Sequence, residues 1–345
     1  MATIILVPHY PSPRFRATNV TRTYWLDSYI RPRHRDSFMP PTSAAHPTSA
    51  KPPRPLIGIL ILTGAIACFS CMDASAKWLN RDLDPLQISG LRYLVSLLAV
   101  GLFLNPRTRP GILRTEKPVL QCLRALCLIG MTLGCFIALR FLPLTQITAI
   151  NFSAPLITAL LAGPLLGEKI GPRRLIAVLV GFVGVLIVTR PFGTGLQPAV
   201  GLALLAALSN AFYFLITRQL ASHDSSETTM LYTSAVGALL VSPLLFFVWK
   251  TPSTLAVWAV AIGLGVAGAI GHWLLILAHR HAPASVLAPF FYAQIIGATL
   301  FGMTVFGEKP DRWTVLGSAI VIGSGLYLLY RERVRHKFPS NDVAV

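Results

Sequence analysis

One segment of this chain occurs twice, and the repetition restricts the possible folds more than any other feature. The segment contains an arginine followed three residues later by a proline, and it ends with Gly-Glu-Lys. Its copies run from Arg140 to Lys169 and from Arg280 to Lys309 with the same internal spacing, and both lie in apolar sequence. Solenoid repeats have periods of about 20–50 residues, far shorter than this one. The period instead indicates a duplicated half of a membrane protein.

The low content of charged residues places most of the chain in a bilayer. Charged residues make up 12% of the sequence and hydrophobic residues 54%, whereas soluble proteins contain about 25% charged residues. The apolar residues gather into continuous runs, and a helix needs roughly 20 apolar residues to cross the hydrocarbon core. Strands of a membrane barrel would alternate apolar and polar residues instead. We therefore predict an all-α integral membrane protein.

The apolar runs predict ten transmembrane helices. Pro, Gly or charged residues bound each run, as expected at helix ends. Each copy contains five helices, and an odd number makes the second copy cross the membrane in the opposite sense. Two inverted five-helix repeats result, and such repeats place a binding site near the membrane midplane, where the halves meet. The predicted helices are 56–78, 85–104, 119–141, 145–163, 173–190, 198–218, 228–249, 255–279, 284–306 and 312–330.

The same pattern divides the chain into four parts. Residues 1–54 are rich in Pro, Ser, Thr and Arg, and we expect a disordered basic tail. Residues 55–191 and 197–331 are the two repeats, and residues 332–345 form a cytoplasmic tail. The tail at the start could be an organelle transit peptide, or translation could begin at Met39. Whether it is a genuine part of the protein stays open.

The net charge of +17 comes from the N-terminal tail and from the loops and ends of the apolar runs. No loop forms the basic, aromatic-interleaved module that binds nucleic acid, so we expect no nucleic-acid partner. In membrane proteins Lys and Arg gather in the short cytoplasmic loops. The basic loops at 105–118 and 167–174 therefore predict that both termini are cytoplasmic.

Six short segments carry a family resemblance, and in chain order they are Met72–Trp78, Leu91–Arg92, Arg140–Leu144, Ser153–Pro155, Gly167–Lys169 and Gly181–Val185. Over residues 55–331 the sequence resembles the drug/metabolite transporter superfamily, in the group with two EamA domains. The resemblance implies a ten-helix carrier of the inner membrane that moves small organic solutes by alternating access. The Asp-Ala-x-x-Lys-Trp ending of the first helix is similar to that of members that take up S-adenosylmethionine or riboflavin.

Charged side chains inside the predicted spans are costly, so each is a candidate functional residue. Asp73 in the first helix and Arg92 in the second lie at similar depth, where an ion pair could gate the path or contact the solute. The alternative is that Lys77, four residues after Asp73, is its partner in a structural cluster. Arg124 lies near the inner end of the third helix, where it could reach the cytoplasmic interface or line a cavity.

Several polar residues complete the candidate site. His272 lies in the inner half of the eighth helix and could titrate near neutral pH or pack in the bundle. Asn210 and Gln294 lie near mid-depth, and Asn151 lies nearer the outer end of the fourth helix. A buried amide needs hydrogen-bond partners, so these residues either join helices or line a cavity. The equivalence of the fourth and ninth helices favours cavity lining for Tyr292 and Gln294.

Prolines and acidic residues mark the ends and interiors of the fourth and ninth helices. Pro155 and Pro289 lie within them and are predicted hinges, because proline removes a backbone hydrogen bond and kinks a helix. Glu168 and Glu308 belong to the Gly-Glu-Lys ends of the two copies, in loops on opposite faces of the membrane. We expect them to cap or brace helices, not to share one site.

Two sets of glycines permit close approach of helices, either within the bundle or between two subunits. Monomer and homodimer therefore both stay open. The sets are Gly181 and Gly184 in the fifth helix, and Gly317, Gly323 and Gly325 in the tenth.

The sequence predicts a secondary active transporter that moves a small organic metabolite or drug-like solute across the inner membrane. The alternative is an integral membrane enzyme that acts on a lipid-linked substrate, but Asp, His and Glu are too few and too scattered for such a site. We expect no enzymatic activity, no cofactor and no metal site. The expected partners are the solute and the bilayer, with protons as a candidate coupling ion. Substrate identity and the direction of transport stay open.

Overall fold

The computed structural model describes residues 55–104, 110–166, 171–190, 197–220, 223–282 and 284–337. The predicted tail 1–54, the end of the predicted tail 332–345 and Glu168 lie outside these ranges. Every element in the described ranges is a helix, so the predicted all-α fold is confirmed. Nine spans within these ranges are long and apolar enough to cross a membrane, and a shorter apolar helix, Pro289–Val305, lies at the position of the ninth predicted span.

Prolines begin most spans of the first repeat. A proline suits the first position of a helix because the missing N–H has no carbonyl partner there and its fixed φ is already helical. The elements are α1 (Pro55–Leu79), α2 (Pro85–Leu104), η1 (Pro110–Leu113), α3 (Pro118–Ala138), α4 (Leu144–Asn151), α5 (Ala154–Leu166) and α6 (Pro172–Thr189).

Side-chain caps begin two helices of the second repeat. The hydroxyl of Ser225 accepts the N–H of Thr228 at 3.1 Å, and that of Thr254 accepts the N–H of Val257 at 3.3 Å, which satisfies amides that the helix itself leaves free. The elements are α7 (Pro198–Leu220), α8 (Ser226–Val241), η2 (Ser242–Leu244), α9 (Leu245–Val248), α10 (Leu255–His281), α11 (Ala284–Leu287), η3 (Ala288–Ala293), α12 (Gln294–Val305) and α13 (Arg312–Lys337).

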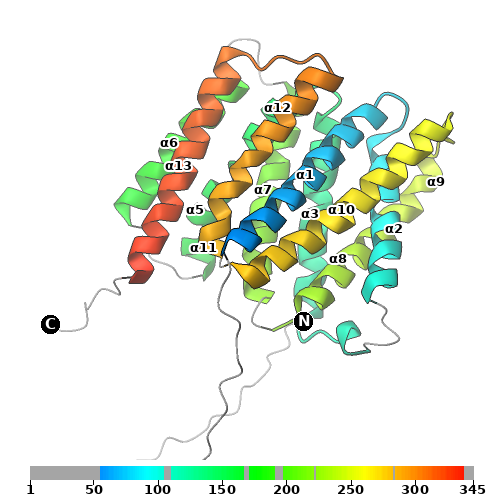
Figure 1. Ribbon diagram of the computed structural model, residues 1–345, viewed down its shortest axis with the longest axis horizontal. Helices are drawn as coiled ribbons and strands as arrows, with labels where there is room; N and C mark the ends of the chain where they lie inside the picture. Colours follow the sequence, from blue (N-terminus) through cyan, green and yellow to red (C-terminus); the bar gives the residue numbers. More distant parts are fainter. Residues whose placement is uncertain are drawn as a thin grey trace, which may run out of the picture. The chain divides into compact units, whose positions relative to one another are not determined.

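The two repeats interlock instead of forming separate bundles. α1 packs along α10, and α3 packs along α7, so the first helix of each repeat lies against the third helix of the other. α6 and α13, the last helices of the two repeats, lie side by side (Figure 1). Such an exchange of equivalent contacts is expected when inverted repeats are related by a pseudo-two-fold axis in the membrane plane.

Both copies of the fourth helix are interrupted. In the first repeat the helix is divided into α4 and α5, and in the second the 3-10 helix η3 separates α11 from α12. Pro155 is the second residue of α5, and Pro289 is the second residue of η3. Each lacks the N–H that would continue the helical hydrogen bonds. The predicted spans 145–163 and 284–306 are therefore present as interrupted helices, with the breaks next to the two prolines, while a hinge motion there stays a prediction.

Phe152 and Tyr292 lie at the two interruptions and occupy the same position in the two repeats. Their rings contact each other edge to face, with centroids 5.0 Å apart and planes at 77°. Residues related by a two-fold axis can touch only when both lie close to that axis. The interruptions therefore meet in the interior of the bundle, where irregular backbone is shielded from lipid.

The glycines hold α6 and α13 together within one subunit. A Cβ atom on Gly184 would lie 2.9 Å from the carbonyl oxygen of Gly317, and a Cβ atom on Gly317 would lie 2.6 Å from that of Gly184. Gly181 also lacks room for a Cβ atom, because the side chains of Leu156 on α5 and Ser324 on α13 lie against it. These glycines thus serve contacts inside the bundle, one of the two uses that the sequence left open. Gly323 differs, because a Cβ atom there would meet nothing within 4 Å.

The Gly184–Gly317 contact predicts a stability difference between two glycine substitutions. Gly317→Val places methyl groups against the α6 backbone, and such overpacking costs about 1–3 kcal/mol. We expect a lower melting temperature of the detergent-solubilised protein, measured by tryptophan fluorescence. Gly101→Val is the matched control, because a Cβ atom at Gly101 meets nothing within 4 Å. Equal melting temperatures for the two variants would show that α6 and α13 are not closely packed at Gly184 and Gly317.

Candidate functional site

Asp73 and Gln294 are brought together by the packing of α1 against α12. The amide Nε2 of Gln294 donates to Oδ2 of Asp73 at 3.1 Å, and both side chains are half-buried. Gln294 is the first residue of α12, directly after the interruption at η3. The bond therefore joins the first repeat to the second at the point where regular helix resumes.

Arg92 is buried on α2, with 4% of the residue exposed. Its Nη1 donates to the hydroxyl of Thr132 on α3 at 3.1 Å, and its guanidinium lies over the ring of Tyr93 at 4.8 Å. Its Nε has no hydrogen-bond partner. Arg92 is close enough to Asp73 for their charges to interact. Among the described ion pairs, however, none joins these two residues, so the direct pair expected from the sequence is not formed.

Arg124 is the second buried arginine, and all its described partners are uncharged. Nε donates to the hydroxyl of Thr217 at 2.6 Å, Nη2 donates to the hydroxyl of Tyr213 at 2.7 Å, and Nη1 donates to the hydroxyl of Thr233. These residues lie on α7 and α8 of the second repeat. Arg124 therefore faces the bundle interior, and the alternative in which it reaches the cytoplasmic interface is wrong.

Three buried polar atoms around Asp73 lack partners. They are the Ser70 hydroxyl, Arg92 Nε and the Asn151 carbonyl oxygen Oδ1. The amide nitrogen of Asn151 donates to the sulfur of Cys135 at 3.1 Å. Cys135 in turn lies close enough to Asp73 and Arg92 to interact electrostatically with both. Buried polar atoms without partners are uncommon in native proteins. Three such atoms, on α1, α2 and α4, make this part of the bundle the candidate site.

The remaining candidates fall into different surroundings. His272 is half-buried, and its ring contacts that of Phe69 edge to face, with centroids 5.1 Å apart. It lies close enough to Arg92 and Arg124 to interact electrostatically with both. Asn210 is half-buried on α7, and no hydrogen bond among the described residues joins it to the other candidates.

Tyr292 points away from the candidate site. A Cβ atom on Gly325 would collide with the Tyr292 hydroxyl, which places that hydroxyl against α13. Tyr292 also belongs to a buried apolar cluster with Leu156 of α5 and Val178 of α6. The expectation that it lines the site beside Gln294 is therefore not supported, because the 3-10 turn of η3 directs the two side chains differently.

Lys77 pairs with an acidic residue that the sequence did not connect to it. Its Nζ lies 2.6 Å from Oε1 of Glu308 and donates to the carbonyl oxygen of Leu142 at 2.7 Å. The other oxygen of Glu308 accepts the N–H of Leu144, in the first turn of α4, at 3.1 Å. The expected role of Glu308 as a brace of helix ends is confirmed. The expected Asp73–Lys77 pair is replaced, because Lys77 extends from the end of α1 toward the connection that follows α12.

The end of the bundle that carries Lys77 and Glu308 is closely packed. One buried apolar cluster there includes Leu79 of α1, Phe136 of α3, Ile150 of α4, Ala203 of α7 and Leu264 of α10. α4 packs against α7 and α12, whereas α5, beyond the interruption, packs mainly against α6 and α7. Apolar side chains of both repeats therefore fill this end of the bundle.

The signal for Glu308 was present in the repeat itself. Glu308 and Glu168 stand at the same distance from an Arg-x-x-Pro segment in both copies, and the structure shows Glu308 capping the helix after the Arg-x-x-Pro segment of the other copy. No comparable signal identified the hydroxyl partners of Arg124, because threonines are common in apolar helices. Among the described residues, no group of three or more His, Cys, Asp or Glu side chains could hold a metal ion.

Comparison with known proteins agrees with this architecture. Residues 56–190 and 197–331 each match the model of the EamA-like transporter family. An S-adenosylmethionine uptake transporter of Rickettsia bellii is 30% identical over 281 residues, which are 80% of this chain and 94% of that protein. A riboflavin transporter of Vibrio cholerae is 29% identical over 294 residues, which are 83% of this chain and 97% of that protein.

A solved structure shares the fold. It is titled "Crystal structure of protein", and it aligns with a TM-score of 0.56 and 22% identity over 80% of this chain and 98% of its own. The family model matches most of the chain in two copies, and the relatives are named as transporters of small metabolites. The chain therefore belongs to the EamA-like transporter family and is a multi-pass membrane protein that transports a small metabolite.

Proposed function

We propose that this chain is a secondary active transporter of a zwitterionic, amino-acid-like metabolite of the S-adenosylmethionine type. It works by alternating access in the inner membrane, with both termini cytoplasmic. The observation that carries the proposal is the buried charge of Arg92, which has no carboxylate in ion-pairing distance among the described residues and lies near Asp73.

A buried guanidinium without an anionic partner is strongly unfavourable in a membrane interior. A solute carboxylate would neutralise Arg92 and could accept a hydrogen bond from its free Nε. The carboxylate of Asp73 is then suited to the solute ammonium group, since its described hydrogen-bond donor is the neutral amide of Gln294. The two ends of an amino acid thus match the two charges of the site.

The names of the relatives suggest two candidate solutes, and the charges distinguish them. S-adenosylmethionine carries a carboxylate, an ammonium and a sulfonium group, so it complements both Arg92 and Asp73. Riboflavin carries no charged group at neutral pH and would leave both unpaired. Burying an uncompensated charge is costly, so the site favours the amino-acid-like solute.

The membrane enzyme considered above is not favoured. The described residues contain no group of three or more acidic, His or Cys side chains close enough to hold a metal ion, and the relatives are named as transporters. We therefore propose no enzymatic activity. Protons are the candidate coupling ion, because Asp73 belongs to the site and His272 lies near Arg92.

The charge-matching proposal is tested by transport of labelled S-adenosylmethionine into liposomes that contain the full chain. Arg92→Gln leaves the solute carboxylate without its partner, which costs about 2 kcal/mol or more, or roughly a 30-fold loss of affinity. Asp73→Asn should weaken uptake similarly. Arg114→Gln, a change at an exposed arginine outside the spans, should leave uptake unchanged.

A solute analogue without the carboxylate provides the matched control. This decarboxylated analogue should bind weakly to the unchanged protein, and Arg92→Gln should not weaken it further. If Arg92→Gln weakens both solutes equally, Arg92 acts through the fold and does not contact the carboxylate. If the protein moves riboflavin and not S-adenosylmethionine, the proposed solute class is wrong.

We also propose that Lys77 and Glu308 close the outer end of the transport path. Glu308→Gln keeps the size of the side chain and removes its charge, so the outer end should open more often. The readout is the labelling of Cys135, retained as the single cysteine, by a membrane-impermeant thiol reagent added from outside. We expect labelling several-fold faster in Glu308→Gln than in the unchanged protein. Lys250→Gln, at an exposed residue between α9 and α10, is the control, and equal rates in all three proteins would exclude the gating role.

A further inference from the structure

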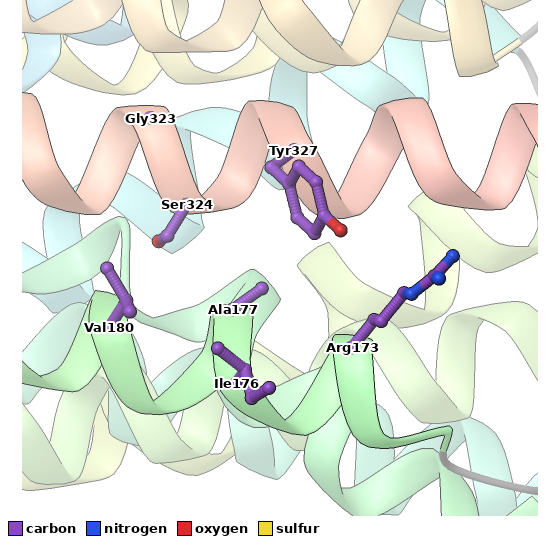
Figure 2. A pocket seen from close by; sticks show the side chains of 7 residues that line it. All are labelled: Arg173, Ile176, Ala177, Val180, Gly323, Ser324 and Tyr327. Carbon is purple, nitrogen blue, oxygen red and sulfur yellow. The ribbon is translucent and has the colours of Figure 1, made fainter.

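A groove open to the membrane runs between α6 and α13 (Figure 2). Its volume is about 310 Å³, at the lower end of the range of roughly 300–1,000 Å³ that is typical of ligand pockets. None of its lining residues belongs to the candidate solute site. They are Arg173, Ile176, Ala177, Val180, Gly323, Ser324 and Tyr327.

The groove exists because small residues line its floor. Gly184 and Gly317 bring α6 and α13 into backbone contact toward one end of the seam. Farther along, Gly323 leaves open space on α13. Figure 2 shows the Ser324 side chain of α13 pointing toward α6, where Ala177 and Val180 lie. The result is a narrow channel with apolar walls that faces the acyl chains of the surrounding bilayer.

One end of the groove is polar and positively charged. Arg173 is the second residue of α6 and is exposed, and no described ion pair involves it. Figure 2 shows the Tyr327 ring above this end, with its hydroxyl on the side of Arg173. The dipole at the start of α6 adds positive potential there. Arginines near a membrane surface attract anionic headgroups, and basic pockets between transmembrane helices bind them.

We propose that this groove binds an anionic phospholipid. The headgroup phosphate accepts hydrogen bonds from Arg173 and the Tyr327 hydroxyl, and one acyl chain lies along Ile176, Val180 and Gly323. A second copy of the chain fits less well. A helix with its side chains is roughly 10–12 Å across, too wide for a groove of this volume. The inference does not depend on which solute is transported.

Native mass spectrometry of the full chain, purified and mixed with phosphatidylglycerol or phosphatidylcholine, tests the proposal. We expect the unchanged protein to retain one phosphatidylglycerol more than Gly323→Leu and Arg173→Gln retain. Gly323→Leu fills the groove without a clash, since a Cβ atom there meets nothing within 4 Å. Gly263→Leu is the matched control, at another exposed glycine with open space, and it should retain the lipid.

The possible outcomes separate the occupants. Loss of one phosphatidylglycerol in Gly323→Leu and Arg173→Gln, with retention in Gly263→Leu and little phosphatidylcholine bound to any protein, supports the proposal. An unchanged lipid count in Gly323→Leu overturns it. A dimer that Gly323→Leu dissociates, with the lipid count unchanged, also overturns it and assigns the groove to a second copy of the chain. Melting temperatures of the four proteins check that none is unfolded.

Discussion

The bilayer demands that every backbone amide and carbonyl be satisfied within the protein, and the interruptions of the fourth helix in each repeat are arranged around this demand. Both interruptions meet near the pseudo-two-fold axis, where Phe152 and Tyr292 touch. Protein covers the irregular backbone there. Because the helix resumes at Gln294, this residue lies beside Asp73. At the other interruption, Asn151 ends α4, and its side-chain oxygen Oδ1 has no hydrogen-bond partner. The polar site thus depends on two broken helices that only the interior of the bundle can accommodate.

The scaffold is close to symmetric, but the polar residues on it are not. α3 and α10 are equivalent helices, yet the positions of Arg124 and Thr132 on α3 correspond to Leu264 and His272 on α10. The guanidinium of Arg124 donates hydrogen bonds to the second repeat. Leu264, at the equivalent position on α10, cannot make such bonds to the first repeat. The two repeats therefore share one helix arrangement but differ in their polar side chains. A bound solute would meet a single, asymmetric set of charges.

The spans were predictable from the sequence, and their partners were not. Long apolar runs bounded by Pro and Gly determine where a helix lies, because hydrocarbon thickness sets the length. The rotation of a helix about its axis is set by packing, so the sequence left open whether Arg124 faces the interface or the bundle. The partner of Lys77 depends on how a loop after α12 reaches the end of α1. The prolines indicated the interruptions, but the turn of η3 that separates Tyr292 from Gln294 followed only from the structure.

Glu308 takes part in two interactions at once. It therefore couples the energy of an ion pair to the stability of a short helix. One oxygen neutralises Lys77, and the other accepts an amide of the first turn of α4, a helix of eight residues. So short a helix has little stability of its own in isolation, and a lost cap costs it about 0.5–2 kcal/mol. A movement of the loop after α12 away from both α1 and α4 therefore breaks the ion pair and removes the cap together. In the gating that we propose, opening at this end and loosening of the first half of the fourth span are one cooperative event.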